Sequence, residues 1–258
     1  MLTRQTIIQS LTTLNQHPFI RAASLGGSDA TGRADDLSDV DLFVLAERGH
    51  IEPAATVIET QLRQLSAIKL AYRLPMPTWH GFHQAFYQLQ DAPEYLMVDW
   101  VIIEVGTPHP WLEVERHGTH KVLFDKDGLL RPTHVNREAL AAAIQKKVED
   151  LRAKFQLFRH LPPKLVDRGT PADAAHFYHA LILRPMVDML RITFAPDRYD
   201  FGFRYLAYDL PFDHYMDVCR WCYPPGAAEL KSFTAEISAA FDRLLKQWDA
   251  RPKSRPGE

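Results

Sequence analysis

Hydrophobic residues in the first half of the chain recur at two different spacings. Aliphatic residues repeat with helical spacing over residues 1–16 and again over residues 53–68, and both segments are predicted to be helices. Residues 70–90 hold two prolines and an aromatic patch and give no clear pattern. Short runs rich in β-branched and aromatic residues predict strands at residues 18–25, 40–47, 95–105 and 121–125.

The pattern becomes entirely helical after Pro132. Asn136 is a good N-cap, and the apolar residues that follow it form one stripe on a predicted six-turn helix. Further helices are predicted from Thr170 through a kink at Pro185 and over residues 227–248, the first of them carrying Phe177, Leu181, Met186 and Leu190. The stripe consists of Leu140, Ile144, Val148, Leu151, Phe155 and Phe158.

These patterns predict an α+β protein of two domains. Residues 1–131 are expected to form a small mixed sheet with flanking helices, and residues 132–258 a helical bundle whose basic tail, residues 251–258, is flexible. The length of 258 residues suffices for a full hydrophobic core without disulfide or metal support.

Composition narrows the class of protein further. Lys and Arg total 30 and Asp and Glu total 32, so the net charge of −2 argues against a nucleic-acid partner. No stretch of 18 apolar residues occurs, so no membrane partner is expected. The two cysteines, Cys219 and Cys222, form no disulfide framework or complete zinc site, and with the absence of a signal-peptide pattern they predict a cytoplasmic protein.

One segment carries the candidate chemistry. Gly26, Gly27 and Ser28 follow the predicted strand at residues 18–25, and glycines at such a turn let the backbone approach a phosphate closely. Asp39 comes eleven residues after Ser28, and Asp41 two residues later, at the start of the next predicted strand. Residues i and i+2 of a strand share a face, so these two carboxylates are expected to converge.

Such a convergence is unfavourable without a cation. Two like charges about 4 Å apart repel by about 4 kcal/mol at an effective dielectric constant of about 20. Bound Mg²⁺ reverses the sign of this interaction, prefers carboxylate oxygens, and takes triphosphate oxygens as further ligands. A third carboxylate, Asp99, lies within the apolar strand predicted at residues 95–105, where a charge needs a partner.

This arrangement resembles the DNA polymerase beta-like nucleotidyltransferase superfamily. The pattern of that superfamily is Gly-Ser, a spacer of about ten residues, Asp-x-Asp on a strand, and a third Asp on a later strand; this chain matches it at Gly27, Ser28, Asp39, Asp41 and Asp99. Thr31 stands where small members often carry Arg, and Arg33 lies two residues further on. The two-domain arrangement is similar to that of aminoglycoside adenylyltransferases, whose helical domain often carries a nucleotide-facing Lys. Arg204 lies in the corresponding segment here.

The resemblance implies a set of roles for these residues. Asp39 and Asp41 are expected to hold Mg²⁺, and Asp99 either completes a second metal site or acts as the base toward the acceptor hydroxyl. Phosphates of the donor, ATP or another nucleoside triphosphate, are expected to contact Gly26, Gly27, Ser28, Arg33 and Arg204.

The implied activity is transfer of a nucleoside monophosphate, AMP from ATP, to a hydroxyl of a small molecule, with an aminoglycoside-like acceptor as the default. A protein or RNA acceptor and a non-catalytic nucleotide-binding relic are the alternatives. Four residues between the carboxylate strands are candidates for an acceptor pocket: Trp79, His80, His83 and Phe86.

Overall fold

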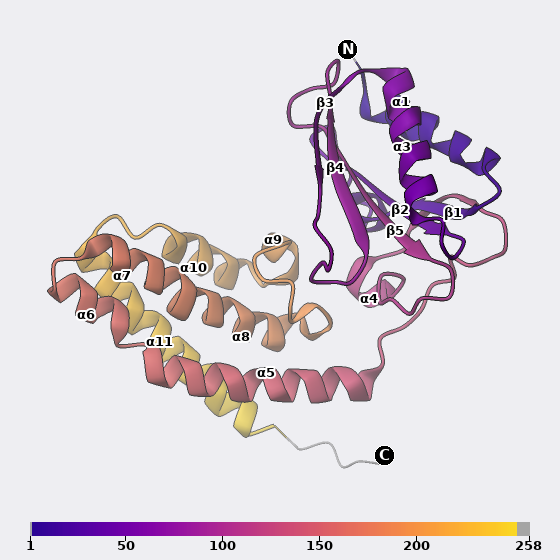
Figure 1. Cartoon of the computed structure of the whole chain (residues 1–258). Helices are drawn as coiled ribbons and strands as arrows, with labels where there is room; N and C mark the ends of the chain where they lie inside the picture. The colour runs from indigo at the N-terminus through magenta and orange to yellow at the C-terminus, as the bar shows by residue number, and fades with distance from the viewer. Residues whose placement is uncertain (1, 252–258) are drawn as a thin grey trace. The chain divides into compact units, whose positions relative to one another are not determined.

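The protein is described here by a computed structural model covering residues 2–251. The chain is α+β and divides into two compact units, Met1–Val135 and Asn136–Glu258 (Figure 1). Sequence analysis places this boundary after residue 131. Nearly all of the tail predicted to be flexible, residues 252–258, lies outside the described residues.

The first unit is built on a mixed sheet. Within residues 2–251, six strands pair in the order β3-β4-β5-β2-β1-β6, and of the neighbouring pairs only β2 and β5 run parallel (Figure 1). The strands are β1 (Ile20–Leu25), β2 (Val40–Ala46), β3 (Ile68–Arg73), β4 (His83–Leu89), β5 (Met97–Glu104) and β6 (Lys121–Asp125).

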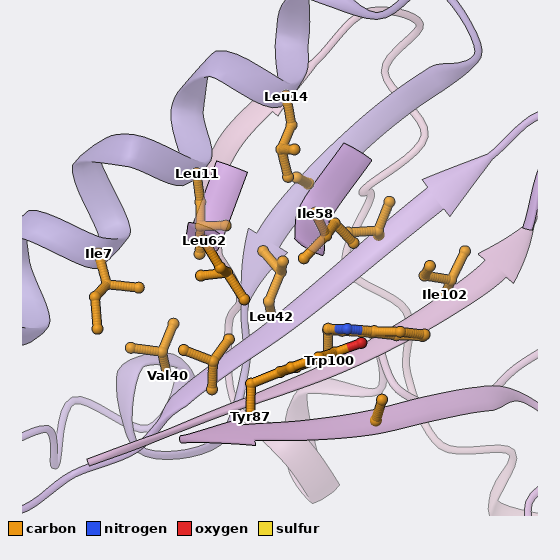
Figure 2. Close-up of a cluster of buried hydrophobic side chains, with 14 of the residues drawn as sticks. Ile7, Leu11, Leu14, Val40, Leu42, Ile58, Leu62, Tyr87, Trp100 and Ile102 are labelled. Atoms are coloured by element: carbon orange, nitrogen blue, oxygen red, sulfur yellow. The ribbon is translucent and has the colours of Figure 1, made fainter. Parts of the chain in front are cut away.

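Two helical segments cover one face of this sheet. Helix α1 (Arg4–Leu11), the 3-10 turn η1 (Thr12–Gln16) and α3 (Ile51–Leu65) place their buried aliphatic side chains against alternate residues of the strands (Figure 2). Burying each such side chain stabilises the fold by about 1.5–3 kcal/mol. The sheet residues that meet the helices include Val40, Leu42, Val44, Tyr87, Trp100 and Ile102.

The opposite face is covered only in part. Phe43 and Leu45 of β2 and Val101 and Ile103 of β5 pack against Leu112, Leu130 and neighbouring residues of the segment that contains α4 (Val114–His117). Strands β2 and β5 are therefore buried on both faces along most of their length. Charged side chains occur on these strands close to their ends, at Asp41, Asp99 and Glu104.

Two sequence predictions for this unit are corrected. The helix predicted over residues 1–16 changes to 3-10 geometry after Leu11, and the helix predicted to residue 68 ends at Leu65. Ser66 is extended, and its hydroxyl donates to Asp91 at 2.8 Å, which ends α3 and starts the chain toward β3. The segment 70–90, which gives no clear pattern in the sequence, contains most of β3 and all of β4.

The second unit is helical. The stripe predicted after Asn136 is confirmed: Ile144, Val148, Leu151 and Phe155 are buried, and the Asn136 side chain accepts from Ala139 N at 3.0 Å as the N-cap. The helices are α5 (Arg137–Phe158), α6 (Leu161–Asp167), α7 (Pro171–Tyr178), the π-helical turn η2 (His179–Leu183), α8 (Arg184–Phe194), the 3-10 turn η3 (Pro196–Arg198), α9 (Leu206–Asp209), α10 (Phe212–Cys222) and α11 (Ala227–Asp249).

A buried arginine organises the non-helical part of this unit. Arg191 on α8 is fully buried and pairs with Asp209 at 2.8 Å. Its guanidinium also donates to the carbonyl oxygens of Gly202 and Arg204, so the segment between α8 and α9 is fastened to α8. Cys219 and Cys222 are free thiols on α10. No helix among residues 2–251 is long and apolar enough to cross a membrane.

The packing in the core of the second unit allows the effect of one substitution on stability to be predicted. Phe155 and Phe241 are fully buried and stack with ring centroids 3.9 Å apart. Phe241→Ala is expected to lower the free energy of unfolding by about 3–5 kcal/mol, measured by chemical denaturation, because a large cavity replaces the ring. The control Leu157→Ala removes an exposed side chain of α5 and is expected to change stability by less than about 0.5 kcal/mol. Equal effects of the two substitutions would contradict this core.

Candidate active site

The turn after β1 approaches β2 so closely that it excludes a side chain. Gly26 N donates to the carbonyl oxygen of Asp41 at 2.9 Å, and Gly27, with φ +51°, begins the short helix α2 (Gly27–Ala30). A Cβ atom on Gly27 would lie 1.9 Å from Asp41 Oδ2. Glycine at position 27 is therefore required twice, by its backbone conformation and by the contact with the carboxylate.

Two of the predicted carboxylates lie directly opposite each other. Asp41 on β2 and Asp99 on β5 are partners in the parallel pairing, so their Cα atoms are about 4.8 Å apart. Both side chains point to the partly covered face of the sheet, on the side of Phe43 and Val101. Asp39 precedes β2 by one residue, and its Oδ1 accepts from Met97 N at 3.0 Å at the start of β5.

Burial and crowding make this site electrostatically unusual. Burial raises the pKa of Asp99 to about 7; the hydrogen bonds from Gln84 oppose this shift, and the charges of Asp41 and Asp39 add to it. The pKa of Asp41 is also raised, first by burial and then by Asp39 and Asp29. The folded protein therefore disfavours the full negative charge of its own carboxylates, and a bound cation would relieve this.

One cation of the chain partly offsets this charge. The guanidinium of Arg4, at the start of α1, pairs with Asp29 of α2 and donates to the carbonyl oxygen of Asp39 at 3.1 Å. Arg4 thereby holds α1, the glycine turn and the segment before β2 together.

Ser28 is the predicted phosphate-binding residue with the clearest structural support. Its Oγ is buried and has no hydrogen-bond partner among the described residues. A buried hydroxyl left without a partner costs about 1–3 kcal/mol, so a ligand oxygen in hydrogen-bond reach would stabilise it.

The two arginines among the predicted phosphate contacts lie in different units of the chain. Arg33 is half-buried, and its backbone N–H donates to Ser28 O at 2.9 Å, which closes the loop that follows α2. Thr31, at the position where the resembled family often carries Arg, donates its hydroxyl to Gly27 O at 3.1 Å. Arg204 belongs to the helical unit, on an exposed turn where its guanidinium lies over Phe201 at 4.7 Å from the ring centroid.

The carboxylates suit a metal ion that takes part of its coordination from a ligand. Over residues 2–251, no group of three or more His, Cys, Asp or Glu side chains is arranged to hold an ion by itself. Mg²⁺ does not need such a group, because it is commonly bound by one or two carboxylates together with waters and substrate phosphates. Asp41 and Asp99 provide such a pair, and Asp39, turned toward Met97 N, stands beside them.

Gln84 and His120 contact Asp99 and the glycine turn, although no pattern in the sequence indicates either residue. Gln84 on β4 donates to both carboxylate oxygens of Asp99 at 2.8 and 2.9 Å. His120 lies on the far side of the turn, 3.6 Å from a Cβ built on Gly26, and its Nδ1 is 2.9 Å from Ser24 Oγ. Burial lowers the pKa of His120 to about 4, so its imidazole is neutral at physiological pH.

The candidate acceptor-pocket residues are only partly brought together. Phe86 pairs directly with Asp99 across β4 and β5, and His80 reaches Asp99 through Gln84. Trp79 is 86% exposed on the loop before β4. His83 has the opposite strand parity to Phe86 and therefore lies on the other face of the sheet.

Neither a comparison with models of known protein families nor a comparison with curated proteins finds a match for this chain. The geometry of the site therefore carries the functional argument.

The glycine turn yields a paired prediction. Gly27→Ala introduces both backbone strain and a collision with Asp41, whereas Gly32→Ala, at φ +68° in open space, introduces strain alone. Strain of this kind costs about 1–3 kcal/mol, so Gly27→Ala is expected to lose that amount and more, and Gly32→Ala only that amount. Chemical denaturation measures both losses. Equal losses would show that the turn does not press against Asp41.

The raised pKa of Asp99 predicts how stability depends on pH without metal. The unfolded chain releases the Asp99 proton near pH 3.8, but the folded chain holds it until about pH 7. Between these values the folded state binds more protons, so the stability of the wild type falls as pH rises from about 4 to about 7. Asp99→Asn removes this dependence and is expected to gain about 3 kcal/mol relative to the wild type across that range. Chemical denaturation in EDTA at several pH values measures the gain, and a constant difference between the proteins would contradict it.

Proposed function

We propose that this chain is a Mg²⁺-dependent nucleotidyltransferase that moves a nucleoside monophosphate, AMP from ATP, to a hydroxyl of a small molecule. The observation that carries the proposal is the meeting of three features at one end of β2: the facing carboxylates Asp41 and Asp99, the side-chain-free turn at Gly27, and the buried, unpartnered hydroxyl of Ser28. In this proposal the first unit is the nucleotidyltransferase domain and the second a helical bundle domain.

Different residues of the chain would bind the metal ion and the phosphates of the donor. Asp41 and Asp99 would hold Mg²⁺, with Asp39 next to them, and the ion when bound neutralises the charge of the triphosphate and polarises it. The Ser28 hydroxyl donates to a phosphate oxygen, and the absence of a side chain at Gly27 allows the phosphates to approach the turn. Arg33, in the loop that follows α2, is a further candidate for a phosphate contact.

The transfer step requires one base, which accepts the proton of the acceptor hydroxyl. The acceptor oxygen forms a bond to the α-phosphorus while the bond from this phosphorus to the bridging oxygen of pyrophosphate breaks. The acceptor proton passes to the carboxylate of Asp99, and pyrophosphate leaves with the electron pair of the broken bond. Asp99 is the better-placed base of the pair, since Asp41 contacts the glycine turn while Asp99 faces β4.

The surface next to Asp99 favours a ring-bearing small molecule as the acceptor. Pairing across the sheet aligns Asp41, Asp99, Phe86 and Tyr72 in one row on one face. The rings of Phe86 and Tyr72 are stacked, with centroids 6.4 Å apart, and Tyr72 is 59% exposed. An acceptor whose hydroxyl reaches Asp99 would lay the flat side of its ring along these aromatic side chains, as an aminoglycoside-like sugar does on an aromatic surface.

Calorimetric titration with each of the four nucleoside triphosphates, with and without Mg²⁺, tests the proposal. One triphosphate, expected to be ATP, binds only with Mg²⁺. Asp41→Asn and Asp39→Asn weaken this binding, the former by more than the 10–100-fold typical of losing a residue that only supports a metal ligand. The control Asp36→Asn removes the same charge from an exposed position in the preceding loop and is expected to bind as the wild type does.

Two outcomes would contradict the proposal. Binding that is the same with and without Mg²⁺, or unchanged in Asp41→Asn, would remove the metal site. Absence of binding by any triphosphate at millimolar concentration would contradict both the proposed transfer and the non-catalytic nucleotide-binding alternative.

A further inference from the structure

We infer that Gln84 and His80 are positioning residues that fix the orientation of the Asp99 carboxylate for metal binding. This inference rests on the proposed function and adds to it two residues that are neither metal ligands nor phosphate contacts. It connects the loop between β3 and β4 to the candidate active site through a continuous chain of hydrogen bonds.

The chain of hydrogen bonds has three links. Gln84 Nε2 lies 2.8 Å from Asp99 Oδ1 and 2.9 Å from Oδ2. Gln84 Oε1 lies 2.9 Å from His80 Nε2. His80 Nδ1 accepts from the backbone N–H of Phe82 at 3.1 Å.

The groups at the two ends of this chain of hydrogen bonds determine which atom is the donor in each bond. The Phe82 N–H can only donate, so His80 Nδ1 carries no proton and the proton of the neutral ring is on Nε2. His80 Nε2 therefore donates, and the oxygen of the Gln84 amide must face it. The amide nitrogen then faces Asp99, which as a carboxylate can only accept.

A contact with Thr78 does not change the assignment of His80 Nδ1 as an acceptor. Its Oγ lies 3.3 Å from His80 Nδ1, but it donates to the carbonyl oxygen of Phe82 at 2.7 Å. A hydroxyl has one proton, so Thr78 does not also donate to His80, and the Phe82 N–H is the donor at Nδ1.

Packing holds both side chains in place. Gln84 and Phe86 are two residues apart on β4 and share a face, and Phe86 is the direct partner of Asp99. Gln84 thus reaches Asp99 diagonally across the strand pair. The His80 ring stacks on Phe82 at 5.7 Å between centroids and meets the edges of Trp79 and Trp111 at 4.9 and 5.6 Å.

The position of Asp99 explains why it needs such support. Asp41 presents a like charge on the adjacent strand, and electrostatic repulsion favours turning the Asp99 carboxylate away from it. Two hydrogen bonds from one amide hold both carboxylate oxygens in a fixed plane beside Asp41. Hydrogen-bonded supports of this kind tune metal affinity without touching the metal.

The test measures Mn²⁺ affinity in the presence of ATP, by calorimetry and by the electron paramagnetic resonance of free Mn²⁺. Gln84→Leu removes the amide and is expected to weaken Mn²⁺ binding by about 10–100-fold. The matched control is Gln88→Leu: Gln88 lies on the same strand and face, but its amide donates to Glu94 O at 2.7 Å instead of to Asp99. Its affinity is expected to equal that of the wild type.

Substitutions at His80 separate positioning from a merely structural role. His80→Gln can place an amide N–H near the position of Nε2 and is expected to retain wild-type affinity, whereas His80→Asn is too short to reach Gln84 and is expected to weaken Mn²⁺ binding. Thermal unfolding of the two variants should coincide, so a difference in affinity cannot come from unfolding. In the wild type, ¹⁵N NMR of the metal-free protein is expected to show the His80 ring protonated at Nε2 alone.

The outcomes distinguish this inference from the proposed function. If the wild type binds Mn²⁺ and ATP together while Gln84→Leu and His80→Asn bind them equally well, the positioning role is wrong and the proposed function stands. A His80 ring protonated at Nδ1 would also overturn the chain of hydrogen bonds. If the wild type shows no Mn²⁺-dependent ATP binding, the proposed function fails and the positioning role fails with it.

Discussion

The side-by-side placement of Asp41 and Asp99 is the interaction on which the rest of the first unit depends. The parallel pairing of β2 and β5 imposes it, and both strands are buried on two faces beyond this point, so neither carboxylate can move far. Each surrounding group offsets part of the free-energy cost of burying two carboxylates side by side. Gly27 leaves space for the Asp41 side chain, Gln84 donates two hydrogen bonds to Asp99, and Arg4 brings a positive charge to the site by pairing with Asp29 and donating to Asp39 O. Burial of like charges side by side is costly to maintain, and carboxylates with perturbed pKa values of this kind cluster at functional sites.

Local sequence patterns predict much of the fold and part of the candidate site. The alternation in β2 places Val40 and Leu42 in the core and leaves Asp41 on the other face, and the stripe after Asn136 places Ile144, Val148 and Phe155 in the helical core. These predictions succeed because each depends on residues within one element. They do not depend on which elements become neighbours.

The residues that were missed depend on such neighbours. Gln84 lies in a segment with no readable pattern, and its contact with Asp99 exists only because β4 pairs antiparallel with β5 in one register. Arg4 and Asp29 are 25 residues apart and meet through the packing of α1 beside the glycine turn. Side-chain hydrogen bonds between distant strands leave no periodic trace in a sequence, so pattern analysis has nothing to detect.

A similar failure in the helical unit has a local cause. Sequence spacing places Phe177 and Leu181 in line with Met186 and Leu190. Met186 and Leu190 are buried, but Tyr178 and Ile182 are fully buried in place of Phe177 and Leu181. The π-helical turn His179–Leu183 inserts wider backbone geometry just before Pro185, which cannot donate a backbone hydrogen bond, and this changes which side chains face inward. A regular helical period cannot represent such a change.

The aromatic side chains beside the carboxylates affect which acceptor molecule could approach Asp99. Two acidic residues of this unit are already engaged by neighbouring side chains: Asp29 pairs with Arg4, and Asp91 accepts from Ser66. Next to Asp99, the sheet instead presents Phe86 and Tyr72. If the proposed function holds, selection of an acceptor at this face would depend on the shape and stacking of a ring, and the negative charge of the site would serve to bind the metal ion. On this face the sheet thus carries its acidic side chains at β2 and β5 and its aromatic side chains at β3 and β4, and Gln84 lies at the boundary between them.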